Sequence, residues 1–158
     1  MRKQTFCLIF VLTVMMSATM FVVAQAARPS VKAAEVNGTF KMNFNGKFRK
    51  FSNEIKILAL GGGKIRFAMD LVYPYSMKNG EPMVNMGGLD GEASIVGDTA
   101  NYVSEDGGCK FVFKFVKPGT IKITEDETDG GCGFGHNVSA QGTYLKVSRL
   151  KPTFESVN

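Results

Sequence analysis

The chain has 158 residues, of which 19 are basic and 14 acidic, and its formal net charge is +5. Arg2 and Lys3 belong to a predicted N-terminal signal, and the charge that remains is small and scattered along the chain. A nucleic-acid-binding protein gathers its basic residues into a stripe or patch. The charge distribution therefore argues against nucleic acid as a partner.

The first 26 residues have the pattern of a secretory signal peptide. Two basic residues precede an apolar stretch over residues 8–23, and Ala24-Gln25-Ala26 supplies a small-x-small cleavage site. The alternative is a retained membrane anchor, but the stretch falls short of the roughly 18 residues that a spanning helix needs. We expect cleavage, a periplasmic or secreted protein, and no membrane span in the mature chain.

Cleavage would leave 132 residues, which suffice for one domain with a core. Composition does not change along this part, and no low-complexity tract or linker interrupts it. We expect a flexible N-terminus over residues 27–34, a single β domain over 35–150 and a C-terminal tail over 151–158.

The clearest structural signal is a hairpin centred on Lys117-Pro118-Gly119. Apolar residues alternate with others from Cys109 to Phe115, and the alternation resumes at Ile121 and Ile123. With a three-residue loop that ends in a left-handed glycine, Phe115 faces Ile121, Phe113 faces Ile123 and Val116 faces Thr120. All large odd-numbered side chains then lie on one face of the hairpin.

Other stretches repeat this alternation. A first strand starts near Val36, and the Gly61-Gly62-Gly63 loop closes a hairpin in which Ala59, Ile57 and Ile55 face Ile65, Phe67 and Met69. A third hairpin turns at Gly97-Asp98 and sets Ile95 against Ala100. The last strand is expected over residues 136–147, with a bulge after Gly142 where the apolar parity switches.

These elements predict an all-β fold with seven or eight strands in an antiparallel up-and-down meander. The turns are too short for crossover connections. Such a meander closes into a small barrel or folds over as a β-sandwich. The similarity between Gly38-Thr39-Phe40 in the first strand and Gly142-Thr143-Tyr144 in the last favours the barrel.

Two cysteines, Cys109 and Cys132, remain after the signal peptide is removed. In an oxidising compartment we expect them to form a disulfide. The bridge would close a loop of 24 residues and contribute roughly 3 kcal/mol on the loop-entropy argument. The spacing is not that of a CxxC redox pair, so the bridge is interpreted as structural.

Residues 74–88 lack alternation and are interpreted as one long loop. Two readings are open: a lid whose side chains pack over one end of the sheet, or a recognition loop. The candidate contact residues are Tyr75, Met77, Lys78, Met83 and Met86. Methionine-ligated copper is disfavoured by the irregular spacing and the single histidine, and no cofactor is expected.

Three further features have plain structural interpretations. The acidic run over residues 125–130 resembles a calcium loop but lacks the twelfth-position Glu, so a solvated hairpin end is expected. His136 has no partner nucleophile and is placed at a strand rim. Asn37 and Asn137 head glycosylation sequons that fall in predicted strands.

Several short motifs resemble a known family. They are Gly91-x-Ala93, Ala100-x-Tyr102, Cys109-x-Phe111-x-Phe113, Cys132-Gly133-Phe134-Gly135-x-Asn137-Val138 and Gly142-Thr143-Tyr144. Together they resemble a small secreted β-domain of bacteria, found alone or beside domains of the lysozyme-inhibitor type. The likeness covers residues 35–147. It implies an exported, non-enzymatic protein that binds or inhibits cell-wall-directed enzymes, and it supplies no inhibitory motif.

We therefore expect an exported binding module without catalysis, because the sequence shows no nucleophile–base pair, carboxylate dyad or metal-ligand cluster. Its partner would be a protein whose identity the sequence does not give. The alternative is a calycin-like carrier that holds a small apolar ligand inside the barrel. The many inward phenylalanines favour a barrel filled by its own side chains.

Overall fold

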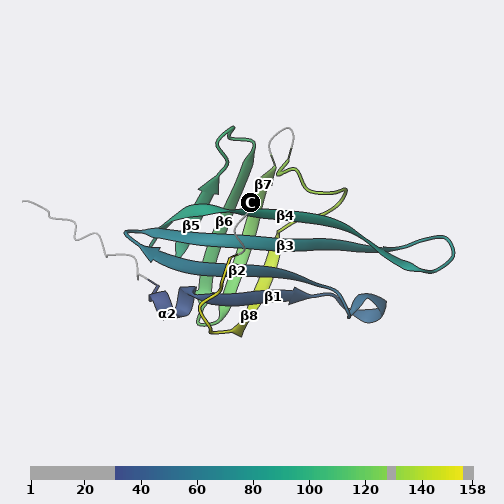
Figure 1. The fold of residues 1–158 in the computed structure, drawn as a ribbon, viewed down its shortest axis with the longest axis horizontal. Coiled ribbons are helices and arrows are strands. Elements are labelled where there is room, and N and C mark those ends of the chain that lie inside the picture. The colour runs from purple at the N-terminus through teal and green to yellow at the C-terminus, as the bar shows by residue number, and fades with distance from the viewer. Residues whose placement is uncertain (1–30, 128–130, 155–158) are drawn as a thin grey trace, which may run out of the picture.

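The computed structural model describes residues 31–127 and 131–154, and within them eight strands form a closed barrel in sequence order (Figure 1). The strands are β1 (Gly38–Asn43), β2 (Ser52–Gly61), β3 (Lys64–Ser76), β4 (Pro82–Val96), β5 (Thr99–Val103), β6 (Cys109–Lys117), β7 (Thr120–Glu127) and β8 (Gly142–Ser148). A short helix α2 (Ala33–Val36) precedes β1, and a 3-10 turn η1 (Gly46–Phe48) joins β1 to β2. The predicted all-β antiparallel meander is confirmed, whereas the predicted signal peptide lies outside the described residues.

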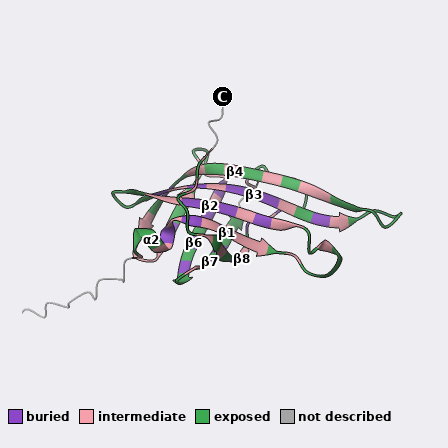
Figure 2. Cartoon of the chain, turned by 60° about the horizontal axis from the view of Figure 1, so that its bottom comes forward, coloured by how far each residue is buried: buried purple, intermediate pink, exposed green. Residues whose placement is uncertain are grey.

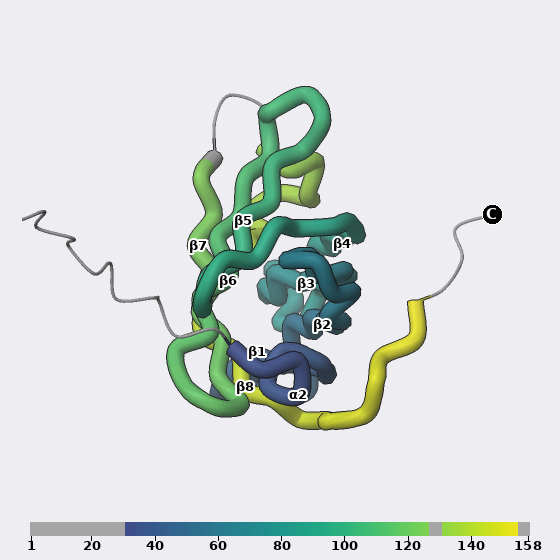
Figure 3. The backbone as a smooth tube through the Cα atoms, turned by 90° about the vertical axis from the view of Figure 1, so that its left-hand side faces the viewer, coloured from purple at the N-terminus to yellow at the C-terminus, as the bar shows by residue number. Residues whose placement is uncertain are grey.

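Closure distinguishes the barrel from a sandwich. β1 pairs with β8 through Phe40 opposite Lys146, so the first and last strands complete the ring. Figure 1 shows β5, β6 and β7 crossing behind β2, β3 and β4 at a steep angle, and Figure 3 shows these two groups on opposite sides. The barrel is therefore flattened into two crossed layers. Strands with one apolar face are compatible with either architecture, so the pairing of β1 with β8 is what identifies the barrel.

The predicted hairpin registers are confirmed at their apolar pairs. Ile55, Ile57 and Ala59 face Met69, Phe67 and Ile65, and Ile95 faces Ala100. In the β6–β7 hairpin Phe113 faces Ile123 and Phe115 faces Ile121. One detail was wrong. Thr120 pairs with Lys117, and a register shift between Phe115 and Lys117 leaves Val116 outside the ladder.

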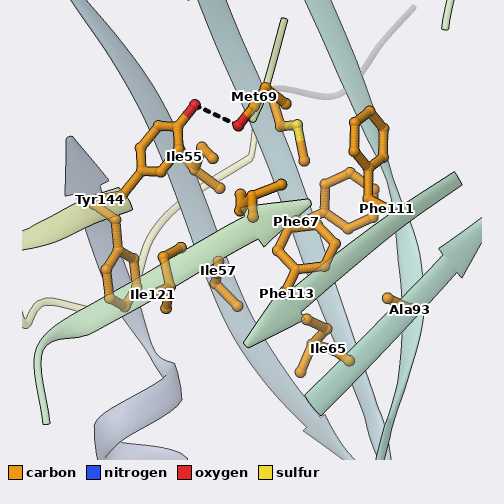
Figure 4. Close-up of a cluster of buried hydrophobic side chains, with 14 of the residues drawn as sticks. Ile55, Ile57, Ile65, Phe67, Met69, Ala93, Phe111, Phe113, Ile121 and Tyr144 are labelled. Carbon is orange, nitrogen blue, oxygen red and sulfur yellow. Dashed lines mark hydrogen bonds between the residues drawn. The ribbon is translucent and has the colours of Figure 1, made fainter. Parts of the chain in front are cut away.

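The inward face of each strand fills the barrel. Figure 2 shows buried residues alternating with more exposed ones along β2 and β3, as the sequence alternation predicts. Phe67 packs edge-on against Tyr102 with ring centroids 5.0 Å apart, and also contacts Phe113 at 5.0 Å. Figure 4 shows Phe67, Phe111 and Phe113 packed together in the interior. The other large interior residues are Phe40, Ile55, Ile57, Ile65, Met69, Leu71, Phe111, Phe115, Ile121, Ile123 and Tyr144.

The interpretation of residues 74–88 as one long loop was wrong. β3 and β4 continue through them in unbroken register, from Asp70 opposite Gly88 to Ser76 opposite Pro82. Only residues 77–81 form a turn, closed by the Met77 amide donating to Glu81 O at 2.9 Å. Sequence alternation missed the strands because this part has no continuous core to face.

Residues 71–88 form the distal hairpin, which projects from the barrel (Figure 1). The pairing of β2 with β3 ends at Asp70, and β5 pairs with β4 only over residues 94–96. Between those limits β3 and β4 form their strand ladder with each other alone. The distal hairpin is thus a two-stranded arm held by the barrel at its base.

The last strand begins later than predicted, at Gly142 rather than residue 136. Asn137 has φ 62°, a left-handed conformation that a strand does not accommodate. The predicted parity switch was also wrong, because Tyr144 is buried whereas Leu145 and Val147 are exposed. The irregularity lies instead in the partner strand, between Thr39 and Phe40.

Both ends of the described chain pack on the barrel. The Lys146 ammonium donates to the carbonyl oxygens of Glu35 at 2.6 Å and Asn37 at 2.8 Å. These carbonyls lie at the C-terminal end of α2, where a helix leaves its last carbonyls without intrahelical partners. In the C-terminal segment, the Phe154 ring lies 4.6 Å from the Arg66 guanidinium on the outer face of β3. Among the described residues, no helix is long and apolar enough to cross a membrane.

Candidate binding site at the distal hairpin

A covering loop, residues 131–141, lies between β7 and β8 and is fixed at its start by the predicted disulfide. Cys109 and Cys132 are bonded, with Cα atoms 4.6 Å apart. Cys109 is the first residue of β6 and is buried, so the loop is attached directly to the barrel wall. Phe134 then stacks on Phe111 with ring centroids 6.1 Å apart, which extends the core into the loop.

The middle of the covering loop is joined to β4. The Gly135 amide donates to Met86 O at 3.1 Å, and the Asn85 side-chain amide donates to His136 O at 2.7 Å. A Cβ atom at Gly135 would lie only 2.7 Å from Met86 O, so the close approach requires glycine. These contacts hold the loop against the base of the distal hairpin.

The end of the covering loop is held by a partly buried polar network. One carboxylate oxygen of Glu125 accepts the Ser139 hydroxyl at 2.7 Å and the Ala140 amide at 2.9 Å. The Tyr144 hydroxyl donates to Ala140 O at 2.9 Å (Figure 4), and burial raises the pKa of this phenol. Glu125 was expected in a solvated hairpin end, but its carboxylate accepts hydrogen bonds that fix the end of the covering loop.

Asn53 joins the distal hairpin to the same network. It is 1% exposed, and its side-chain oxygen accepts the Val72 amide at 2.8 Å. Its amide group lies 3.5 Å from Ser139 O. No cluster of three metal-ligating side chains occurs in the described ranges, which include Glu125 and Asp126 of the acidic run. The network is built to fix backbone, and it leaves the covering loop attached at both ends and in the middle.

A hollow of about 480 Å³ opens where the covering loop meets the distal hairpin. It is lined by Tyr73, Tyr75, Asn85, His136 and Asn137. Tyr73 and Asn85 are register partners, and Tyr75 lies two residues further along the same face. His136 and Asn137 are both exposed, and they belong to the covering loop. The hollow is therefore walled by two elements that are separate in sequence.

The five predicted contact residues do not share one surface. Tyr75 lines the hollow and pairs with Met83 on the same face. Met77 and Lys78 lie in the exposed turn at the tip, and Met86 lies on the opposite face of β4, where it is 70% exposed. Such exposure contradicts a lid, because a lid would bury these methionines. The covering loop closes this end of the barrel instead.

The open edges of the distal hairpin are protected against strand addition. The Ile95 amide donates to the Gly63 carbonyl in the β3–β4 ladder. The backbone N–H and C=O groups of odd-numbered residues therefore pair within the hairpin, and those of even-numbered residues point away from it, toward its open edges. Pro74 and Pro82 occupy such outward positions, where a missing N–H costs no ladder bond. On the same edge as Pro74, the Val72 amide donates to the side-chain oxygen of Asn53. The two prolines and the occupied Val72 amide disfavour the addition of a partner strand, so we expect recognition here to use side chains.

The chain matches no protein-family model, no curated protein and no solved structure. The geometry of the distal hairpin and the covering loop is therefore the basis on which a function can be proposed. The resemblance to a secreted bacterial β-domain stays a prediction.

Sequence reasoning found Tyr75 but missed the other four residues that line the hollow as members of a site. His136 was placed on a strand rim, and Asn137 was considered only as a sequon. Tyr73-x-Tyr75 was a usable signal, since two tyrosines at strand spacing share a face. The contribution from the covering loop had no such signal, because it depends on contacts between distant residues.

Proposed function

We propose that the protein is an exported, non-enzymatic binding module that engages a protein partner through the tip of its distal hairpin. The observation that carries this proposal is the exposure of Met77 (47%) and Met83 (45%) on an arm that projects beyond the barrel. Exposed apolar side chains gathered on a projecting element are typical of an interaction site. Methionine is also enriched in protein interfaces.

The tip is held in shape before any partner arrives. The Asn79 amide donates to the Glu81 carboxylate at 2.8 Å, and the Glu81 backbone amide donates back to the Asn79 side chain at 3.1 Å. Gly80, at φ 86°, provides the left-handed residue that this turn needs. A preformed tip lowers the entropic cost of association. Lys78 adds a positive charge beside the apolar residues.

The filled barrel favours a surface binder over a carrier of an apolar ligand. Phe40, Phe67, Phe113 and Tyr144 are fully buried in the centre of the barrel. A barrel of this size has room either for its own side chains or for one small ligand. Here the side chains take that room, so the interior argues for recognition on the outside.

Export is supported by the disulfide and by the N-terminal sequence pattern. A bridge such as Cys109–Cys132 persists in oxidising compartments. The partner class follows from the resemblance to secreted bacterial β-domains and is a cell-wall-directed enzyme, which the module would bind or inhibit. A partner of this kind would meet the protein in the same compartment.

Site-specific photocrosslinking tests the proposal. A photoreactive phenylalanine analogue replaces Met77 at the tip, and in a matched control it replaces Val116, which is 58% exposed on the barrel wall. Each variant is irradiated in the exported fraction of its source cells. We expect one discrete protein adduct from position 77 and none of that mass from position 116. Equal adducts from both positions, or none from position 77, would reject the tip as the contact site.

A further inference from the structure

We propose that the hollow between the distal hairpin and the covering loop binds a neutral saccharide. Its lining consists of two phenol rings, one imidazole and two carboxamides, from Tyr73, Tyr75, His136, Asn85 and Asn137. This site is distinct from the hairpin tip, because Met77 and Lys78 do not line it. The inference goes beyond the proposed partner contact and does not depend on it.

The chemistry of the lining matches a sugar ring better than a lipid or an ion. A pyranose presents C–H groups on its faces and hydroxyl groups around its edge. Aromatic rings contact the former, and carboxamides can both donate to and accept from the latter. No carboxylate, ammonium or guanidinium group belongs to the lining, so nothing there compensates a charged ligand. The ligand class that fits is neutral and polyhydroxylated.

The polar groups on the loop side are available to a ligand. Within residues 31–127 and 131–154, neither the His136 ring nor the Asn137 carboxamide has a hydrogen-bond partner. Tyr73 is 39% exposed, so one ring of the wall is accessible from solvent. The hollow is thus lined by polar and aromatic groups of two elements, an arrangement expected of a small-molecule site.

The hollow is also preorganised. The covering loop is anchored by Cys132, by the Gly135 amide on β4 and by Glu125 at its end. Asn137 is held at φ 62°, and no other non-glycine residue in the described ranges has positive φ. Residues held in such sparsely populated conformations concentrate at ligand sites. The volume of about 480 Å³ lies within the usual range of roughly 300–1,000 Å³ for such sites.

Binding is tested with three neutral tetrasaccharides, namely cellotetraose, maltotetraose and tetra-N-acetylchitotetraose, titrated into the ¹⁵N-labelled protein with its disulfide intact. We expect at least one of them to bind with a Kd below about 1 mM and to shift the amide signals of Tyr73, Asn85 and Asn137. If none shifts these signals at about 10 mM, the proposal is wrong.

Two variants localise the site. Tyr73→Ala removes one ring of the wall, and Asn137→Gly removes a carboxamide while relieving the left-handed backbone, so the second variant is expected to fold. Each should weaken binding at least about tenfold. Met86→Ala, on the opposite face of the same hairpin, and Asn101→Ala, on the outside of β5, should bind as the wild type does.

Wild-type affinity in a folded Asn137→Gly variant would place any sugar binding elsewhere and overturn the proposal. Photocrosslinking at Met77 is scored separately, so the partner contact and the saccharide site can fail independently.

Discussion

The ring of Phe134 in the covering loop lies directly on the bare Cα of Gly87 in β4. A Cβ atom at Gly87 would stand 2.8 Å from Phe134 Cδ1, closer than side chains tolerate. The same ring stacks on Phe111, so it cannot retreat without opening the core. This contact joins the distal hairpin, the covering loop and the barrel at one point.

Gly87→Ala should therefore destabilise the protein by about 1–3 kcal/mol, the usual cost of overpacking. Gly88→Ala is the matched control, since its Cβ would meet only Met69 O at an ordinary 3.4 Å. The control should stay within about 0.5 kcal/mol of the wild type. Urea unfolding measures both. Equal losses in the two variants would show that strand glycines in general, and not the Phe134 contact, set the cost.

The disulfide should contribute about 2–5 kcal/mol, as native bridges in small secreted domains do. The double variant Cys109→Ser with Cys132→Ser removes it without a reductant having to reach the buried Cys109. Thermal melting of this variant against the wild type gives the difference. An unchanged melting temperature would mean that the bridge adds nothing to the packing of Phe134 and the hydrogen bonds that hold the covering loop.

Stability should fall as the pH rises above about 10, the ordinary pKa of tyrosine. Burial raises the pKa of Tyr144, so the folded state keeps a proton that the unfolded chain releases in this range. A phenolate, moreover, could not donate to Ala140 O. The contribution is complete below pH 10 and is lost as the pH climbs toward the raised pKa.

Urea unfolding at pH 8 and pH 11 measures this loss. Tyr144→Phe should be less stable at pH 8 but should show a smaller further loss at pH 11. Tyr102, whose pKa burial also raises, is the control: Tyr102→Phe should keep most of the alkaline loss. The attribution fails if Tyr144→Phe loses as much stability between the two pH values as the wild type does.

The barrel could be predicted from the sequence because its strands have one face in a continuous core. Ile55, Ile57 and Ala59 alternate with polar residues, and their partners Met69, Phe67 and Ile65 follow from a single glycine turn. The β6–β7 hairpin was predictable for the same reason. Its one error, at Val116, reflects a bulge that the alternation does not encode.

The distal hairpin could not be predicted in this way, because its residues have no continuous core to face. Pro74 and Pro82 also occur within the strands, at positions of the open edges where the ladder needs no N–H. In the covering loop the alternation misled in the opposite way, because it predicted a strand where the structure has a loop. Val138 and Ala140 alternate as in a strand, yet they are buried in the covering loop at the end of the barrel. Asn137, between exposed His136 and buried Val138, has a left-handed backbone.

The most direct test of the account is a hairpin shortened at its tip. Tyr75 and Met83 are register partners, so an Asn-Gly turn can join them in place of residues 76–82 without disturbing the base of the arm. Capture of the partner from the exported fraction is then compared with melting temperature. Val116→Ser, on the barrel wall, is the control and should capture as the wild type does.

Because the tip contributes no buried side chain, the shortened protein should melt within about 2 °C of the wild type. Its capture of the partner should fall at least about tenfold, since Met77 and Lys78 are gone. A shortened protein that still captures the partner but melts well below the wild type would contradict the account, because the hairpin tip would then support the fold rather than recognition.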